Sequence, residues 1–321
     1  KVEEVHRDTV LHDSHDEDLI HLEGLNFPVP LFGLAITATS RNDEQKLSDT
    51  LHKLTEEDPC LAVEHNSATH ETVLRGLSEL HLRMTLEKMR ERYKLEVDTR
   101  PPRIAYRETI NNAAPGHHRH KKQTGGAGQF GEVFLRVEPL ERGAGFEFAS
   151  EVVGGAIPAG LLTAVEKGIR EALAQGAIAG FPLQDIRAVA TDGKTHPVDS
   201  KEVAFVTAGR EAFLDAVRKA QPQVLEPVVN LEVQVPGETV GSITGDLSGR
   251  RGRINGTEVG SDGMVTISAQ VPLAELEGYE SQLKSTTGGH GTYSMEFSHY
   301  EPVPGNVQQQ LIAAWRPATG E

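Results

Sequence analysis

Residues 31–54 read LFGLAITATSRNDEQKLSDTLHKL, and this stretch decides how the first part of the chain is interpreted. Its first nine residues are mostly apolar and predict a strand. A polar break follows, in which Asn42 is suited to cap a helix. Beyond it, Leu47, Leu51 and Leu54 recur at spacings of four and three. This periodicity places the three leucines on one face and predicts an amphipathic helix after the strand.

The residues that follow complete a recognisable unit. Two short strands are predicted near 61–66 and 69–75, and 95–99 predicts a last strand. A second helix between them has four large apolar side chains on one face, namely Leu82, Leu86, Met89 and Tyr93. The order is βαββαβ, the split βαβ arrangement of ferredoxin-like domains.

The same order recurs near the end of the chain. Strands are predicted at 227–235, 253–259, 263–271 and 292–300. Two helices lie between them, a short one marked by Val240, Ile243 and Leu247 and another by Leu273, Leu276 and Leu283. Two copies of one topology therefore flank a middle region, and the fold class predicted is α+β with several domains.

The middle region has a pattern of its own. Strands are predicted near 132–138 and 184–190, and helices over 158–175 and about 200–220. The predicted division of the chain is 1–28 as the tail of an upstream domain, 29–103, 104–225, 226–304, and a polar extension at 305–321.

Composition restricts the class of protein. Hydrophobic residues make up 37% and charged residues 25% of 321 residues, which is typical of a soluble globular protein. No apolar run is long enough to span a membrane. One cysteine, Cys60, excludes an internal disulfide framework and indicates a cytoplasmic protein. A net charge of −15 argues against a protein that coats nucleic acid non-specifically.

Basic residues gather at two places in this acidic chain. Residues 105–131 contain Arg107, Arg119, Lys121 and Lys122 but only Glu108 as an acid. Arg250, Arg251 and Arg253 have only Asp246 as a nearby acid. Such local patches fit a protein that touches RNA at chosen points, although solvated surface charge explains any single patch as well.

Residues 126–133 (GAGQFGEV) match the glycine loop of protein kinases, G-x-G-x-x-G-x-V. A kinase also needs a V-A-I-K lysine, H-R-D and D-F-G, and none of these follows. A dinucleotide site would need a helix after the glycines, where 133–137 predicts a strand. A surface loop that approaches a partner closely is the remaining interpretation.

Residues 188–195 (AVATDGKT) come close to a phosphate-binding loop, with Ala188 at the first glycine position. In such a loop Thr195 would open a helix whose N-terminus holds phosphate, but Pro197 follows and the helix is predicted only near Ser200. A nucleotide-binding enzyme that uses this segment is kept as the weaker alternative. The histidines His117, His118 and His120 lack partners at metal-ligand spacing and predict a polar loop, so no metal is expected.

Two long polar loops, 111–131 and 191–200, interrupt the middle region. If the strands that they join are adjacent, both loops project from one end and form a tip. Glycines in such a tip expose main-chain N–H groups to a sugar-phosphate backbone. Asp199 has Glu202 three residues later, a capping-box spacing, so helix capping is an alternative role for it.

Eight segments occur in an order that closely resembles domains III, IV and V of elongation factor G. They are 58–82 (DPCLAVEHNSATHETVLRGLSELHL), 106–110 (YRETI), 120–133 (HKKQTGGAGQFGEV), 145–158 (GFEFASEVVGGAIP), 196–205 (HPVDSKEVAF), 226–236 (EPVVNLEVQVP), 241–254 (GSITGDLSGRRGRI) and 270–297 (QVPLAELEGYESQLKSTTGGHGTYSMEF). The resemblance covers about residues 25 to 301. It implies ferredoxin-like domains III and V, in agreement with the repeat, and a domain IV similar to the second domain of ribosomal protein S5. Residues 1–28 would end the β-barrel domain II.

The resemblance also implies a function. The family's domain IV enters the decoding site of the ribosome and contacts tRNA and mRNA during translocation, while domain V faces the large subunit. The site residues implied at the domain IV tip are Lys121, Lys122, Gln123, Gly125, Gly126, Gly128, Gln129, His196, Pro197, Val198, Asp199 and Ser200. Those implied in domain V are Arg250, Arg251 and Arg253.

The motifs of a GTPase are missing from this sequence. It has no phosphate loop or guanine-reading motif, so this part is expected to have no catalytic residue and no cofactor of its own. GTP and Mg²⁺ would bind an N-terminal GTPase domain of the same polypeptide. The partners implied are the ribosome, with its rRNA, tRNA and mRNA, and the GTPase domain of the same polypeptide. No membrane partner is expected, and the protein is expected to be a monomer.

Two departures from the family pattern point to a divergent copy. Lys201 replaces the second serine of the usual VDSS tip, and Ala127 replaces an arginine between the glycines. The loss of a guanidinium removes a bidentate phosphate donor. A ribosome-protection or recycling factor of the same family is therefore an alternative to a standard translocase.

Overall fold

The computed structural model describes residue 13, residue 25, and residues 27–66, 69–122, 128–261 and 263–315. By compactness the chain forms two units. One holds Lys1–Ile104, Asn230–Val271 and Glu275–Glu296, and the other holds Ala105–Val229, Pro272–Ala274 and Phe297–Glu321. No helix within these described ranges combines the length and the apolar character that crossing a membrane requires.

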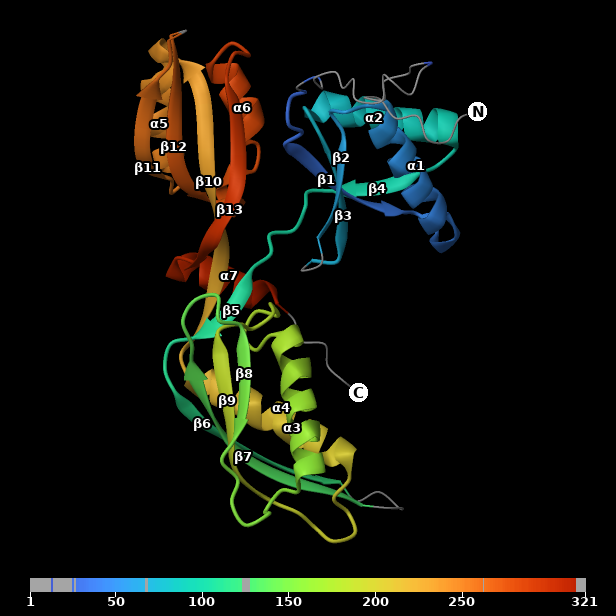
Figure 1. Cartoon of the computed structure of the whole chain (residues 1–321), viewed down its shortest axis with the longest axis vertical. Coiled ribbons are helices and arrows are strands. Elements are labelled where there is room, and N and C mark those ends of the chain that lie inside the picture. Colours follow the sequence, from blue (N-terminus) through green and yellow to red (C-terminus); the bar gives the residue numbers. More distant parts are fainter. Residues whose placement is uncertain are drawn as a thin grey trace. The chain divides into compact units, whose positions relative to one another are not determined.

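The first sheet has the strand order β2-β3-β1-β4. Its strands are β1 (Phe32–Ala38), β2 (Ala62–Asn66), β3 (Glu71–Gly76) and β4 (Val97–Arg100). The helices α1 (Glu44–Glu57) and α2 (Glu79–Tyr93) lie against it (Figure 1). Their buried leucines, which join its core, are Leu47, Leu51, Leu54 and Leu82. The connection β1-α1-β2-β3-α2-β4 with this strand order is a ferredoxin-like fold, which confirms the predicted class.

The side-chain cap before the first helix lies two residues earlier than predicted. Ser40, rather than Asn42, accepts the hydrogen bond, from the Asn42 amide to its Oγ at 3.3 Å. This contact opens a 3-10 turn, Arg41–Asp43, that leads into α1. The short hydroxyl side chain of Ser40 reaches the first free N–H groups from an extended backbone, as N-cap residues do.

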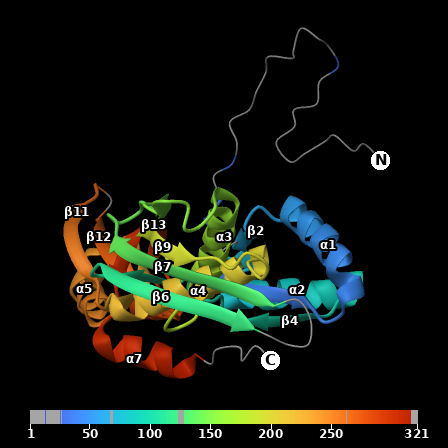
Figure 2. The same ribbon diagram turned by 90° about the horizontal axis from the view of Figure 1, so that it is seen from below.

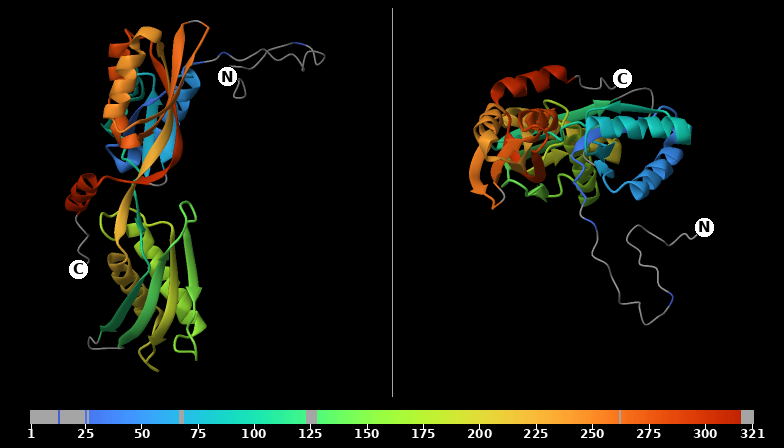
Figure 3. Two further views of the ribbon diagram at one scale, coloured as in Figure 1. Left: turned by 90° about the vertical axis from the view of Figure 1, so that its left-hand side faces the viewer. Right: turned by 90° about the horizontal axis from the view of Figure 1, so that it is seen from above.

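The second ferredoxin-like sheet has the equivalent order β11-β12-β10-β13. Its strands are β10 (Pro222–Pro236), β11 (Arg253–Val259), β12 (Met264–Pro272) and β13 (Thr292–Pro302). Figure 3 shows α5 (Val240–Gly249) and α6 (Tyr279–Thr286) on one side of it, where their apolar residues form a core with the strands. The helix predicted from Leu273 is instead a 3-10 turn, Leu273–Leu276, and a separate α6, because Gly278 takes a left-handed φ of 69° between them.

The third sheet has the order β6-β7-β9-β8 and, with its two helices, forms what we call the middle domain. Its strands are β6 (Ala114–Lys122), β7 (Gln129–Pro139), β8 (Phe146–Ser150) and β9 (Ile186–Lys194), and β8 runs parallel to β9. A further strand, β5 (Arg107–Ile110), pairs with β10. The helices α3 (Ala159–Gln175) and α4 (Glu202–Lys219) share one apolar core with the sheet.

Small residues let α3 and α4 approach closely. A methyl group added at Gly168 would overlap the Val206 carbonyl, and one added at Gly209 would lie 2.8 Å from the Val165 carbonyl. Both helices therefore cover the same face of the sheet, and the opposite face, which we call the outer face, remains uncovered by them. The glycines are required here for backbone contact rather than for a turn.

The chain's last described segment differs from the predicted polar extension. Residues Gly305–Ala314 form α7, whose Val307 and Leu311 pack against a small cluster that includes Val224 and Val303. The Gln308 side chain accepts a hydrogen bond from the Val224 amide at 3.1 Å. Two apolar residues four positions apart pack this short helix against the cluster. The residues around them are mostly polar, so the helical periodicity in the sequence is weak.

Candidate functional site

The predicted loop 111–131 is mostly a β-hairpin. Strands β6 and β7 pair in unbroken register from Ala114 opposite Val137 to Lys122 opposite Gln129 (Figure 2). Polar and charged residues occupy most of β6 because half of them lie on the outer face, so the strand lacked the apolar signal that the prediction needed. The implied site residues Gln123, Gly125 and Gly126, and also Ala127, fall outside the described residues.

The second predicted loop, 191–200, is also shorter than expected. Strand β9 continues to Lys194, so residues 188–194 lie in a sheet and the phosphate-loop interpretation of this segment is wrong. Lys194 pairs with Glu132 of β7. The turn that remains, 195–201, leads directly into α4.

This turn is held against the hairpin by hydrogen bonds to the main chain of Phe130. The Phe130 amide donates to the Asp199 carbonyl at 2.9 Å. Ser200 Oγ donates to the Phe130 carbonyl at 3.0 Å and accepts from the His196 amide at 2.7 Å. Both polar groups of the Phe130 backbone are thus used to join segments 70 residues apart, and the two parts of the predicted tip do lie together.

Gly128 is the point of closest approach between the two segments. A Cβ atom built on it would lie 2.8 Å from the Asp199 carboxylate carbon. Any larger residue would displace Asp199 or the end of β7. Gly128 is therefore needed for packing within the chain, whereas the exposure of main-chain N–H groups to RNA by the tip glycines stays a prediction.

Asp199 does not cap α4. The N-cap position of that helix is Lys201, and no side chain there accepts a hydrogen bond from the helix. The Asp199 carboxylate instead approaches the ring of His196, with Oδ2 at 3.4 Å from Nδ1. The capping-box interpretation is wrong because the helix begins at Glu202, three residues beyond Asp199.

His196 is oriented by the backbone of its own turn. Its Nδ1 faces the amides of Val198 at 3.4 Å and Asp199 at 3.3 Å. When Nδ1 accepts from these N–H groups, the proton of a neutral ring lies on Nε2. The side chain is 52% exposed, so this Nε2–H is available as a donor to a partner.

The other predicted tip residues vary in exposure. Val198 is 77% exposed at the end of the turn, and Pro197 beside it is exposed as well. Lys121 and Lys122 are exposed near the end of β6 and point to opposite faces of the sheet. Gln129 at the start of β7 faces His120, with Oε1 3.0 Å from Nε2.

The histidines of β6 are strand residues rather than loop residues. His117 and His118 point to opposite faces, so the three histidines cannot converge on one ion. Within the described part of the chain, no group of three or more potential ligands is arranged to hold a metal.

The predicted arginines near α5 make contacts within their own domain. Arg250 pairs with Asp246 at 3.0 Å and lies over the ring of Tyr279, with Cζ 5.3 Å from its centroid. Arg251, at a left-handed φ of 60°, pairs with Glu275 at 2.8 Å. Arg253 lies in the exposed strand β11. Arg250 and Arg251 therefore stabilise the end of α5, and a role in phosphate binding stays a prediction.

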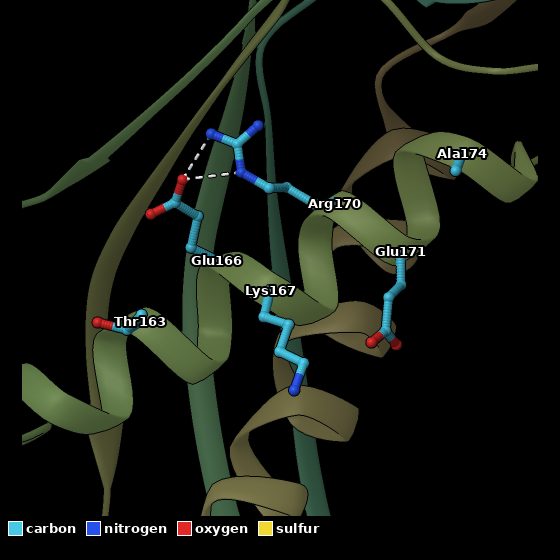
Figure 4. Close-up of a pocket in the computed structure, with 6 residues that line it drawn as sticks. All are labelled: Thr163, Glu166, Lys167, Arg170, Glu171 and Ala174. Atoms are coloured by element: carbon cyan, nitrogen blue, oxygen red, sulfur yellow. Dashed lines mark hydrogen bonds and ion pairs between the residues drawn. The ribbon is translucent and has the colours of Figure 1, made fainter. Parts of the chain in front are cut away.

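A further set of mostly charged side chains lies on the outside of α3. Thr163, Glu166, Lys167, Arg170, Glu171 and Ala174 line an open hollow there (Figure 4). Glu166 and Arg170 form an i,i+4 ion pair at 2.7 Å. All six residues come from one helix, so the hollow is the surface between its side chains and not a built site.

Sequence reasoning missed Phe130, whose backbone joins the tip. Its ring is half-buried, 6.2 Å from that of His196, and the Arg119 guanidinium lies 5.3 Å from its centroid. An aromatic residue between two glycines in the segment GQFGEV was the available signal. Its importance depended on the partner turn, which sequence spacing does not reveal.

Comparisons with known proteins agree with this arrangement. Residues 27–101 match the family described as elongation factor G domain III, 102–221 match elongation factor G domain IV, and 223–311 match the elongation factor G C-terminus. The chain belongs to the elongation factor G family. It comprises the C-terminal part of such a factor, and the tip described above lies in domain IV.

A solved structure supports the same assignment. The chain is similar to a crystal structure of a protein from Thermus thermophilus, with 39% identity and a TM-score of 0.77. The match covers 97% of this chain and 46% of that protein. The chain thus spans about half the length of the Thermus protein that it matches.

Proposed function

We propose that this chain is the ribosome-binding C-terminal part of an elongation factor G-type protein that supports GTP-dependent translocation of tRNA and mRNA. GTP and Mg²⁺ would bind an N-terminal domain of the whole protein. The domain IV tip would enter the decoding site. The observation that carries the proposal is the junction at Phe130, which joins the turn containing His196 to the β6–β7 hairpin as one compact projection.

The chemistry of the tip supports an RNA partner. His196 offers an exposed imidazole ring, and Lys121 and Lys122 offer ammonium groups. Donors of this kind bind phosphate and sugar oxygens and position a protein on RNA without reading sequence. Because the chain carries a net charge of −15, contact would be confined to local groups of basic residues such as those at the tip.

Ribosome binding by this chain is the direct test. We expect the chain to pellet with ribosomes through a sucrose cushion, and less so as salt rises. His196→Ala should weaken binding about fivefold, the factor that loss of one hydrogen bond of about 1 kcal/mol produces. His52→Ala, in an equally polar site on α1 where the side chain is 76% exposed, is the matched control and should bind as the wild type does.

The full-length protein distinguishes the tasks within the family. If it promotes translocation of peptidyl-tRNA, His196→Ala should slow that step while ribosome-stimulated GTP hydrolysis continues. Lys201 at the N-cap of α4 is the described departure from the family pattern, and it favours a divergent copy. A full-length protein that splits post-termination ribosomes but does not translocate would establish recycling instead.

A further inference from the structure

Next to the tip, the outer face of the middle domain carries a ladder of cations and rings. On this face Lys121 lies opposite Phe130, and His117 lies opposite Phe134. Between these two pairs, Arg119, Glu132 and Lys194 form a row across β6, β7 and β9. Directly opposed residues share a face of a sheet, so all these side chains project on the side away from α3 and α4. We call this set the outer-face ladder.

A planar group lies over each of the two phenylalanine rings of the ladder. The Arg119 guanidinium carbon lies 5.3 Å from the Phe130 ring centroid. The ring of His117 lies on that of Phe134 with centroids 4.1 Å apart and planes inclined by 18°. Arg119 and His117 have side chains 57% and 44% exposed, so each presents a planar surface to solvent above its phenylalanine.

A buried carboxylate holds the two planes in place. Glu132 is 6% exposed, and its Oε1 accepts from His117 Nε2 at 2.9 Å. Its Oε2 has no hydrogen bond in the described structure and lies 4.0 Å from Arg119 Nε. A buried carboxylate is costly without compensation, and here two exposed groups on the same face provide it. Glu132 therefore orients Arg119 and His117 rather than facing a partner itself.

The outer-face ladder carries a small excess of positive charge, which fits a negatively charged partner. Lys121 and Lys194 are exposed at its sides, and neither forms an ion pair with any residue that the structure describes. The ladder has three cationic side chains, Arg119 and these two lysines. Two acidic side chains, Glu132 and the exposed Asp192, lie on the same face. The excess is small, so electrostatic attraction alone would be weak and contact with the planar groups would have to add to it.

The planar and basic side chains of the outer-face ladder are the kinds of groups that bind single-stranded RNA. Unpaired bases stack on aromatic rings and on guanidinium planes, while basic side chains follow the backbone. Building on the domain IV function proposed above, we propose that the outer-face ladder binds a single-stranded RNA segment beside the tip. The bases stack on Arg119 and His117, and Lys121 and Lys194 contact the phosphates.

Fluorescence anisotropy with the purified chain and a fluorescein-labelled single-stranded RNA of about twelve nucleotides, within the usual site size of such surfaces, tests this. Saturable binding at low salt is expected. Arg119→Lys keeps the charge and removes the plane, so it should weaken binding about fivefold or more if a base stacks there. Lys194→Ala should reduce the salt dependence as well as the affinity. Arg136→Lys is the matched control, since Arg136 lies on the same face of β7 but is occupied by Glu138 and Glu151.

Several results would overturn the inference: no saturable binding, equal binding by Arg119→Lys and wild type, or tighter binding of a duplex RNA of the same length. Circular dichroism of each variant shows that the fold is retained. Ribosome pelleting separates this inference from the proposed function. If the chain pellets and His196→Ala weakens pelleting, while Arg119→Lys leaves RNA affinity unchanged, the ladder is refuted and the ribosomal function stands.

Discussion

Ser200 and Phe130 are 70 residues apart, and the hydroxyl of the first donates to the main-chain carbonyl of the second at 3.0 Å. The same hydroxyl accepts from the His196 amide at 2.7 Å. One side chain therefore fixes both the closure of the 195–201 turn and its attachment to β7. The position of His196 relative to the hairpin depends on this hydroxyl.

We expect Ser200→Ala to loosen the tip without unfolding the domain. The change removes two hydrogen bonds at a half-buried site, so the local opening free energy should fall by about 1–2 kcal/mol. Hydrogen exchange should rise at the His196 amide and remain unchanged in α3. Ser200→Thr retains the hydroxyl and serves as the control. Equal exchange in the alanine variant and the wild type would show that the hydroxyl does not hold the turn.

Lys201→Ser should stabilise the middle domain. Lys201 occupies the N-cap position of α4 in an extended conformation (φ −108°, ψ 159°), and no side chain caps the helix there. A serine can accept from a free N–H of the first turn, which contributes about 0.5–2 kcal/mol. Scanning calorimetry would show a higher unfolding temperature. Lys201→Ala lacks the acceptor and should show no such increase, and a rise of the same size in both variants would contradict the explanation.

Glu108→Gln should destabilise the same part of the chain more strongly. The fully buried carboxylate accepts from four amides, those of Ala177, Ile178, Ala179 and Phe181, at 2.7 to 3.1 Å. A glutamine presents an NH₂ group to some of these donors, so we expect a loss of about 3 kcal/mol. Urea unfolding followed by circular dichroism would measure it. Glu147→Gln, at an exposed side chain of β8, should change stability little.

Acid should weaken the packing of α4 on β6 through His118. Burial lowers the pKa of His118, although the nearby carboxylates Glu211 and Asp215 act in the opposite direction. A depressed pKa in the folded state means that stabilisation is complete above about pH 6.5, the unfolded value, and is lost as the pH falls below it. Melting temperatures at about pH 7.5 and about pH 5.5, on either side of that value, should therefore differ more for the wild type than for His118→Gln. An unchanged difference in that variant would assign the acid sensitivity to other groups.

The two ferredoxin-like units were predicted well because their signals are local. Leucines three and four residues apart mark α1, and Leu82 to Tyr93 mark α2, whatever the rest of the chain does. The strand order of the two sheets then agrees with the fold class predicted from the element order. The helix expected from Leu273 failed for a local reason as well, since Gly278 interrupts the pattern with a left-handed conformation.

The candidate site was predicted in composition but not in structure. The family resemblance identifies the segments around Gly128 and His196, whereas the sequence predicts loops where the structure has β6 and the end of β9. Strands with one open face carry polar residues at alternate positions, so their hydrophobic signal is weak. For Arg250 and Arg251 the sequence pattern suggests a binding site, but in the structure their side chains pair with Asp246 and Glu275. A surface charge pattern does not reveal such pairing.

The amino-acid sequence specifies the repeated βαββαβ order that begins at residues 31–54, because helix and strand periodicities are set by neighbours a few residues apart. Tertiary structure alone decides that Ser200 reaches Phe130 and that Glu132 lies beneath Arg119 and His117. These contacts join residues on different strands and turns, and their geometry follows from the register of β6, β7 and β9. Hydrogen bonds between distant segments form only when the sheet and its helices have brought the partners within about 3 Å, and that requirement leaves no periodic mark in the sequence.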